Sequence, residues 1–353
     1  MRMISPARFL LTTTAAAGSV VLAAAMPAAS ASLAHAPAAW HVSLQVPGSS
    51  FPEFTAVTAT SGSSAWAFAA VGSKAPVAYQ LSGSSWKSHS FPAKAGDSVQ
   101  AAASSSASNV WAFTFTGQVL RFNGSSWAAV KKFSKVINSG VVVSSTDVWV
   151  FGSPGPGTWH YNGHSWTHST SGSGLNGGSA LSASSIWAYG GTSVAHWNGS
   201  TWTKTSVASL LPKNTQLSHS FVGGIYAASA SNVYAIGSGG RQDEGGPLVL
   251  LHYNGHAWSR VAENTSLGDP TAVIPDGSGG VWIPVRTAFP GDGSMEHYSH
   301  GALSSVRLPF SPPHLLLVAA AIGKHTTAAV AVGYTRKSFS AKTTTAVILR
   351  YGS

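Results

Sequence analysis

The stretch Ser-Asn-Val-Trp-Ala-Phe at 108–113, followed by Arg-Phe-Asn-Gly-Ser-Ser-Trp at 121–127, decides the fold of this chain. In the first phrase aromatic residues alternate with small apolar residues, which is the periodicity of a β-strand. Both faces of this strand are apolar, as expected for a strand packed between neighbours on its two sides. In the second phrase Asn-Gly lies between β-forming residues and predicts a tight hairpin, because both turn residues can adopt a positive φ.

Both phrases recur along the chain. Copies of the first phrase are Thr-Asp-Val-Trp-Val-Phe at 146–151, Ser-Ser-Ile-Trp-Ala-Tyr at 184–189 and Ser-Asn-Val-Tyr-Ala-Ile at 231–236. Copies of the second phrase, each with its Asn-Gly turn, lie at 160–166, 196–202 and 252–258. The marker aromatic residues of successive units are 38 to 48 residues apart, and they are Trp66, Trp111, Trp149, Trp187, Tyr234 and Trp282. A unit of this length with four strands, a to d, predicts the blade of a β-propeller.

A seventh unit is split between the two ends of the chain. Val330 occupies the marker position, and Val-Ile-Leu-Arg-Tyr at 347–351 matches strand c, but no strand d follows. Ala-Trp-His-Val-Ser at 39–43 resembles a strand d with no strand c before it. We therefore predict an all-β, seven-bladed β-propeller of four-stranded antiparallel blades, in which the N-terminal strand completes the last blade. This closure covers the edge of strand c in the last blade.

At these phrases the chain resembles secreted bacterial propellers of the kelch and galactose-oxidase type. The Asn-Gly-x-x-Trp turn also resembles the Asp-box hairpin of sialidase-like propellers, with Gly and Trp in matching relative positions. The resemblance covers nearly all of residues 32–353 and implies the fold. It does not extend to the catalytic residues. The Asp of the Asp-box is replaced by an Asn one residue nearer the Trp, no sialidase-type Arg triad can be placed, and a Tyr–Cys copper site is excluded in a chain without cysteine.

The N-terminus predicts export. Arg2 and Arg8 precede the uncharged stretch 9–25, and Ala-Ser-Ala follows at 29–31, which is the order of a secretory signal peptide. We expect residues 1–31 to be removed, leaving residues 32–353 as a single propeller domain. Ala and Thr make the segment a weak membrane span, so we expect no membrane attachment after cleavage. The predicted location is extracellular or at the cell wall.

The charge and cysteine content of the chain indicate which classes of partner it can bind. The chain has 20 basic and 10 acidic residues, a net charge of +10, and no basic run longer than Lys131-Lys132. Nucleic-acid binders concentrate positive charge on one face, so this pattern does not favour a nucleic acid. The chain has no cysteine, which excludes disulfides and thiolate metal sites. We expect a monomer without a cofactor.

Four histidines occupy the same strand-c position in successive units, namely His160, His196, His252 and His297. Other units carry Gln80, Arg121 and Arg350 at this position. A metal site would need these imidazoles to converge on one ion. Equivalent positions on different blades lie far apart, so we interpret them as contacts within each blade or with its neighbour.

The connections between strands b and c differ in length. They are short in units two to four and long in units five to seven, at 237–247, 286–294 and 334–343. These loops lie on one face of a propeller, and binding residues often lie on loops held by a rigid scaffold. We hypothesise a one-sided binding surface made by Arg241, Asp243, Glu244, Arg286, Phe289, Asp292, Tyr334, Arg336 and Lys337. The alternative is that loops at this face merely tolerate insertion.

The sequence favours an extracellular binding or scaffolding module whose ligand is a glycan, a cell-wall polymer or a protein. The alternative is a carbohydrate-active enzyme, a hydrolase or lyase, because glycoside hydrolysis uses two carboxylates that face one bond. Its candidates are Asp243, Glu244, Asp292 and Glu296, which we expect in loops of blades five and six. No signal indicates that they are buried, so binding is the preferred interpretation and enzymatic activity stays open.

Overall fold

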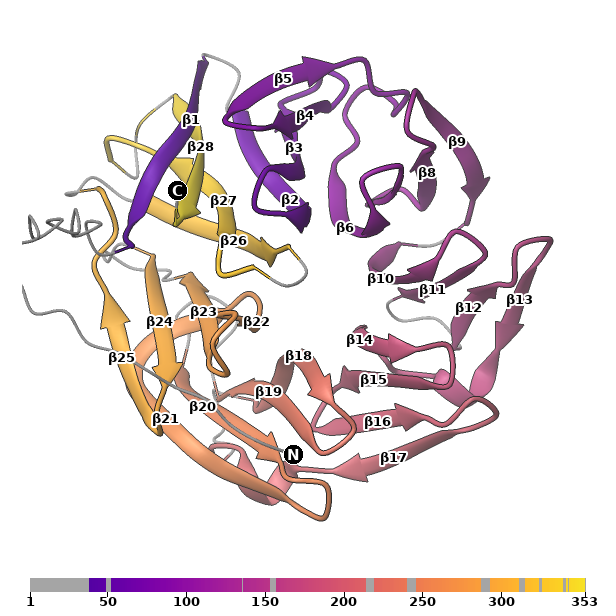
Figure 1. Cartoon of the computed structure of the whole chain (residues 1–353), viewed down its shortest axis with the longest axis vertical. Helices are drawn as coiled ribbons and strands as arrows, with labels where there is room; N and C mark the ends of the chain where they lie inside the picture. Colours follow the sequence, from indigo (N-terminus) through magenta and orange to yellow (C-terminus); the bar gives the residue numbers. More distant parts are fainter. Residues whose placement is uncertain are drawn as a thin grey trace, which may run out of the picture. The chain divides into compact units, whose positions relative to one another are not determined.

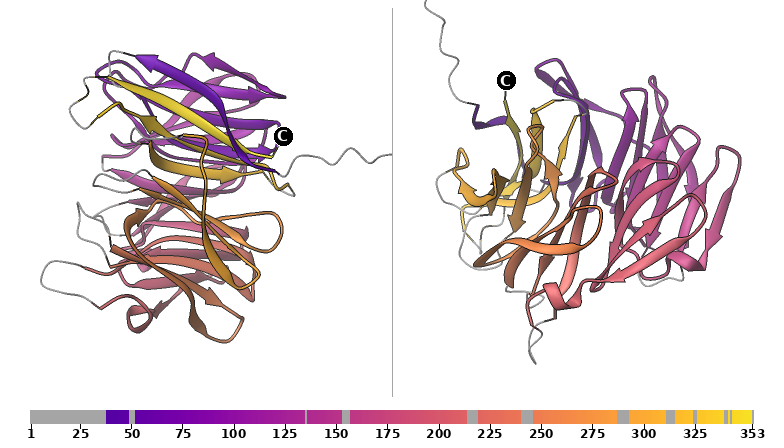
Figure 2. Two further views of the ribbon diagram at one scale, coloured as in Figure 1. Left: turned by 90° about the vertical axis from the view of Figure 1, so that its left-hand side faces the viewer. Right: turned by 60° about the horizontal axis from the view of Figure 1, so that its bottom comes forward.

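The computed structural model describes residues 38–48, 52–134, 136–152, 157–213, 219–239, 246–286, 293–310, 315–323, 326–338, 341 and 343–352. The residues from Ala38 onward form one compact unit. Its strands lie in sheets arranged around a central axis (Figure 1). Seen from the side, these strands run between the two faces of the ring (Figure 2). Among the described residues, no helix has the length and hydropathy that crossing a membrane requires.

The first four blades each contain four antiparallel strands in sequence order from the axis to the rim. Blade one consists of β2 (Pro52–Ser61), β3 (Ser64–Val71), β4 (Val77–Ser82) and β5 (Ser85–His89). Blade two consists of β6 (Val99–Ser106), β7 (Asn109–Thr114), β8 (Gln118–Phe122) and β9 (Trp127–Lys132). Blade three consists of β10 (Ile137–Ser144), β11 (Asp147–Gly152), β12 (Thr158–Tyr161) and β13 (Trp166–Ser169). Blade four consists of β14 (Gly177–Ser182), β15 (Ser185–Gly190), β16 (Ser193–Trp197) and β17 (Trp202–Ser206).

Blades five and six are joined by one long strand. Blade five consists of β18 (Phe221–Ser229), β19 (Asn232–Ser238), β20 (Gly246–Tyr253) and β21 (Trp258–Pro270). The end of β21 crosses to blade six, where Asp269 pairs with Arg286. Blade six continues with β22 (Ile274–Pro275), β23 (Val281–Arg286), β24 (Ser294–Ser299) and β25 (Ala302–Val306). The innermost strand of blade six is thus made of two short pieces, the end of β21 and β22.

Blade seven is completed by the N-terminal strand, as the sequence predicts. It contains β26 (Leu315–Ile322), β27 (Ala329–Thr335), β28 (Thr344–Tyr351) and β1 (Trp40–Gly48), with β1 on the outside. Trp40 lies opposite Tyr351 and Gly48 opposite Thr344 in the antiparallel register. Figure 1 shows β1 beside β28. The prediction of four-stranded blades closed by the N-terminal strand is confirmed.

Blade seven also packs against blade one. A shared core contains Val57 and Leu81 of blade one together with Val330 and Ile348 of blade seven. The Arg350 guanidinium donates a hydrogen bond of 2.7 Å to a backbone carbonyl in blade one. These contacts join residues almost 300 positions apart in the sequence, so the first and last blades are neighbours.

The marker residues occupy equivalent positions in every blade. Each lies on strand b, opposite the strand-c residue that the repeat assigns to it: Trp66–Gln80, Trp111–Arg121, Trp149–His160, Trp187–His196, Tyr234–His252, Trp282–His297 and Val330–Arg350. Five of the six aromatic markers pack against aromatic residues of strands c and d in the next blade, as Trp66 does with Phe122 and Trp127, while Tyr234 packs against Tyr298 of strand c. The recurring phrases therefore encode the contacts between blades.

The Asn-Gly turns differ from the prediction in one respect. Gly124 has a φ of 101°, but Asn123 is not among the described residues with positive φ. Instead, Asn123 Oδ1 accepts hydrogen bonds from the backbone N–H groups of Ser125 and Ser126, both at 3.0 Å. The expectation of two left-handed turn residues was wrong, because the Asn side chain stabilises a longer turn by bonding the backbone ahead of it.

Candidate functional site

The face that carries the connections between strands b and c is uneven, as the sequence predicts. In blade two, β7 ends at Thr114 and β8 begins at Gln118. In blade six, β23 ends at Arg286 and β24 begins at Ser294. The corresponding connections in blades five and seven run from Ser238 to Gly246 and from Thr335 to Thr344. The longer connections thus belong to three consecutive blades.

Four of the nine residues predicted for the binding surface lie in the described part of the chain. They are Arg286, Tyr334, Arg336 and Lys337. The other five lie outside the described residues, and they are Arg241, Asp243, Glu244, Phe289 and Asp292. The described members of the predicted set thus lie on blades six and seven.

Arg286 ends β23 and its side chain is half exposed, at 50%. Its Nη2 lies 3.7 Å from Oδ2 of Asp269, which faces it across the start of blade six. This ion pair is too exposed to contribute much stability. The guanidinium therefore keeps donors that face solvent and that can bind a ligand oxygen.

Tyr334 and Arg336 lie close to a carboxylate from another blade. Burial raises the pKa of the Tyr334 phenol, and the negative charge of Glu53 raises it further, while Arg336 and Arg286 act in the opposite direction. Burial also raises the pKa of Glu53, an effect that the Arg336 guanidinium partly offsets. These groups therefore lie within range of one another's charges. We call Glu53, Asp269, Arg286, Tyr334 and Arg336 the charged face cluster.

The sequence pattern gave no signal for Glu53 or Asp269. Glu53 is the second residue of β2, and Asp269 lies near the end of β21. Neither belongs to a connection between strands b and c, so the loop lengths gave no signal for them. Glu53 joins the cluster because blade seven packs against blade one, and Asp269 because β21 crosses into blade six.

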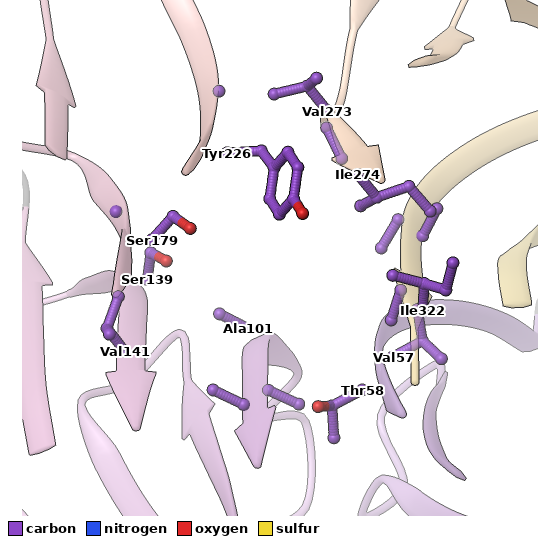
Figure 3. Close-up of a pocket in the computed structure, with 18 of the residues that line it drawn as sticks. Val57, Thr58, Ala101, Ser139, Val141, Ser179, Tyr226, Val273, Ile274 and Ile322 are labelled. Carbon is purple, nitrogen blue, oxygen red and sulfur yellow. The ribbon is translucent and has the colours of Figure 1, made fainter. Parts of the chain in front are cut away.

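A cavity of about 990 Å³ runs along the axis of the ring, and sequence analysis missed it too. It is lined by the innermost strands of all seven blades. We call it the axial cavity (Figure 3). Thr55 and Thr271 line it, and they lie two residues beyond Glu53 and Asp269 along the chain. The charged face cluster is therefore next to one end of the axial cavity.

The strand-c histidines form contacts inside their own blades. His160 stacks on Trp149 with ring centroids 4.2 Å apart, and its Nε2 lies 2.9 Å from Asp147 Oδ1. His297 stacks on Trp282 at 3.9 Å. Arg121, at the same position in blade two, lies over the ring of its own marker tryptophan. Arg350, at the same position in blade seven, bonds to a carbonyl of blade one, so the interpretation of this position as a contact within each blade or with its neighbour is confirmed.

The structure corrects the expected position of one of the four candidate catalytic carboxylates. Glu296 lies inside β24, not in a loop, and it is 2% exposed. Its carboxylate accepts hydrogen bonds of 2.8–2.9 Å from the hydroxyls of Ser294 and Ser305. This carboxylate is enclosed within the blade and is not exposed on a loop, so the expected loop position of Glu296 was wrong. Asp243, Glu244 and Asp292 lie outside the described residues.

Metal binding finds no support in the described part of the chain. No group of three or more His, Asp or Glu side chains there is arranged to hold a metal ion. The charged face cluster instead contains two cationic, two acidic and one phenolic group, which is a set suited to hydrogen bonding.

The chain matches no protein-family model and no curated protein. Solved structures do resemble it in fold. YCF48 bound to D1 peptide is 10% identical, with a TM-score of 0.60 over 89% of this chain and 97% of that chain. A catalytically inactive virginiamycin B lyase from Staphylococcus aureus with quinupristin is 10% identical, with a TM-score of 0.63 over 90% and 99% of the two chains. The WD40 propeller domain of Doa1 is 9% identical, with a TM-score of 0.62 over 88% and 96%. At this identity the likeness shows the β-propeller fold alone.

Proposed function

We propose that this protein is a secreted binding module that holds a protein ligand at the charged face cluster. One observation carries the proposal: ring closure brings Glu53 of blade one within charge range of Tyr334 and Arg336 of blade seven. A half-buried carboxylate, a phenol and two guanidiniums are thus gathered near one another on this face. Such a set can bind a partner through several directed hydrogen bonds.

The chemistry of the cluster favours a protein over the other ligands that the sequence left open. Arg and Tyr, together with Trp, are enriched among the residues that contribute most to the affinity of protein interfaces. Arg286 is half exposed and Lys337 is exposed, so both can reach a ligand on this face. A similar propeller, YCF48, is described as bound to a peptide. A segment with a carboxylate and a hydrogen-bond donor would complement this mixture of charges.

The extracellular part of the proposal comes from the sequence. The signal peptide predicted at residues 1–31 would export the propeller, and the absence of cysteine leaves it independent of disulfide formation. Its kelch-like and Asp-box-like repeats resemble those of secreted bacterial propellers. The proposed location is the cell exterior or the cell wall.

A site-specific photocrosslink tests the proposal. A photoreactive phenylalanine analogue is placed at Lys337 of the exported protein, and irradiation is done on the cells that produce it. We expect one protein partner to be crosslinked from this position. The matched control carries the analogue at Ser200, an exposed residue of a c–d turn on the opposite face, and should not capture that partner.

The purified partner is then titrated by calorimetry. We expect Arg336→Ala to weaken binding by about 30-fold, which is the loss typical of an interface hot spot. Lys87→Ala, on the outer strand of blade one, should leave the affinity unchanged. Equal capture from Ser200, or an unchanged affinity of the folded Arg336→Ala protein, would contradict the proposal.

A further inference from the structure

The axial cavity differs from the rest of the molecule in charge. The protein carries a net charge of +10, yet the described residues that line the cavity include no Asp, Glu, Lys, Arg or His. An ion that enters such a cavity gives up hydration without gaining a counter-ion, which is costly. The cavity therefore selects against charged molecules.

The walls of the cavity differ from side to side (Figure 3). Ser139 of β10, Ser179 of β14 and Tyr226 of β18 present hydroxyl groups from three consecutive blades. Across the cavity, Ile274 of β22 and Ile322 of β26 present aliphatic side chains. Thr58 lies beside Val57, and its hydroxyl is hydrogen-bonded to Ser104 Oγ at 2.8 Å. The side with Ser139, Ser179 and Tyr226 can thus exchange hydrogen bonds with a ligand, while the side with Ile274 and Ile322 offers mainly apolar contact.

The hydroxyl side keeps hydrogen-bonding capacity. Ser179 Oγ accepts a hydrogen bond of 3.1 Å from the Ala227 N–H and so retains a proton to donate. The Tyr226 ring points into the cavity, and its hydroxyl has no hydrogen-bond partner among the described residues. Burial, followed by the charges of Asp276 and Tyr234, raises the pKa of this phenol. Tyr226 therefore stays a neutral donor.

We propose that the axial cavity binds an uncharged small molecule with an aliphatic edge and an alcohol, ester or amide edge. The aliphatic edge lies against Ile274 and Ile322, and the polar edge lies against Ser139, Ser179 and Tyr226. A volume of about 990 Å³ is at the upper end of the range for drug-sized ligands. This site is separate from the charged face cluster and does not depend on the protein ligand proposed for it.

A matched pair of fluorescent dyes tests the selectivity for neutral molecules. Phenylnaphthylamine is uncharged, and anilinonaphthalene sulfonate has the same ring system with an added sulfonate. We expect the neutral dye to saturate one site per chain and to bind about tenfold or more tightly than the sulfonated dye. If the dyes bound only to the protein surface, the net charge of +10 would attract the anionic sulfonated dye and make it the tighter binder.

A cavity-filling substitution tests the location. Ser179→Trp places a large side chain in the axial cavity and should abolish saturable binding of the neutral dye. Ser200→Trp, on an exposed turn, is the matched control and should bind the dye normally. If Ser179→Trp does not fold, Ser139→Trp fills the cavity from the adjacent blade. No saturable binding by the native protein, tighter binding of the sulfonated dye, or unchanged binding in a folded filled variant would overturn the proposal.

Failure of this proposal can be told apart from failure of the proposed function. Ser179→Trp leaves Arg286, Tyr334 and Arg336 in place, so capture of a protein partner from Lys337 should persist in that variant. Conversely, Arg336→Ala removes no residue that lines the axial cavity and should leave dye binding unchanged.

Discussion

At the residue scale, the position two before each marker aromatic decides whether the marker indole is hydrogen-bonded. Trp111 Nε1 donates to Asn109 Oδ1 at 3.0 Å. Trp149 Nε1 donates in the same way to Asp147 Oδ1. Trp66 has Ser64 at this position, and its buried indole N–H has no acceptor among the described residues. A buried donor left without an acceptor costs about 1–3 kcal/mol.

Ser64→Asn should therefore stabilise the protein. The new amide oxygen would accept the Trp66 indole N–H, as Asn109 does for Trp111, and the free energy of unfolding should rise by about 1 kcal/mol. Chemical denaturation measures this change. In a Trp66→Phe background, which has no N–H to satisfy, the same substitution should bring no gain. An equal gain in both backgrounds would disprove the hydrogen-bond explanation.

In blade six the Trp282 indole N–H has no acceptor among the described residues, and the strand-c histidine finds its carboxylate partner at a different position. Gly280 stands two before Trp282, and a Cβ at this glycine would lie 2.6 Å from Asp276 Oδ2. The Asp276 carboxylate occupies the space of the missing side chain, and its Oδ2 lies 2.9 Å from His297 Nε2. Burial tends to raise the pKa of Asp276, but hydrogen bonds from His297, Ser278 and Gly280 hold it below its ordinary value. The glycine makes room for the acid that binds the strand-c histidine.

The strand-c histidines with neutral partners should make stability depend on pH. Burial lowers the pKa of His196 and of His252 below the ordinary value of 6.5. Nε2 of each lies near a neutral oxygen, Ser185 Oγ at 3.1 Å or Asn232 Oδ1 at 2.8 Å. As pH falls, these two histidines therefore take up protons in the unfolded chain before they do so in the folded protein. Their contribution to the free energy of unfolding is complete above pH 6.5. It is lost as pH falls through 6.5 toward the lower pKa values that these histidines have in the folded protein.

Thermal unfolding at pH 7.5 and 5 measures this effect. The double variant His196→Gln and His252→Gln should lose less of its melting temperature on acidification than the native protein. Glutamine is a suitable replacement because Gln80 occupies this position in blade one. His256→Gln, at an exposed turn, should retain the native pH dependence. An unaltered pH profile in the double variant would show that other groups cause the acid sensitivity.

At the element scale, β1 is the outer strand of blade seven, and Trp40 is its buried aromatic side chain. Trp40 is 4% exposed and packs edge-on against Trp282 of blade six at 5.6 Å. In the same way Trp258 of blade five packs against Trp187 of blade four. Trp40 therefore makes the contact between blades that its counterparts on β9, β13, β17 and β21 make elsewhere in the ring.

Trp40→Ala should reduce the free energy of unfolding by about 3–5 kcal/mol, the usual cost of removing a buried Trp. Deleting residues 32–46, which removes most of β1, should leave a chain that aggregates or unfolds. Val42→Ala, on the same strand but 36% exposed, is the control and should change stability little. Calorimetry checks all three, and an unchanged melting temperature of the truncated protein would refute the role of β1.

The structure of the blades could be predicted from the sequence because the contacts that form them repeat along the chain. Each marker aromatic, its strand-c partner and its Asn-Gly turn appear several times, so a single alignment predicts the register of every blade. The site depends on features that occur once. Glu53 meets Arg336 only after the ring closes, and the hydroxyl and aliphatic walls of the axial cavity come from strands that follow no common residue pattern. Loop length pointed to the face on which Arg286 and Arg336 lie, but it gave no signal for Glu53 or for the residues of the axial cavity.

At the scale of the whole molecule, the proposed site depends on the blade that combines the first and last strands of the propeller. β1 and β28 form the outer half of blade seven, and β27 of the same blade carries Tyr334. Thr344 on β28 donates a hydrogen bond of 2.9 Å to the Pro52 carbonyl, next to Glu53. The closure that stabilises the ring therefore also sets the distance between Glu53 and Arg336.

A disulfide across the closure tests this account most directly. Pro47 and Thr345 face each other in the register of β1 and β28, and the native chain has no cysteine to compete. Pro47→Cys with Thr345→Cys should form one intramolecular disulfide as readily as the control pair Gln80→Cys with Lys87→Cys inside blade one. Mass spectrometry under non-reducing conditions measures both. The account predicts a closed monomer in each case, and a closure pair that stays reduced or links two chains while the control pair closes would contradict it.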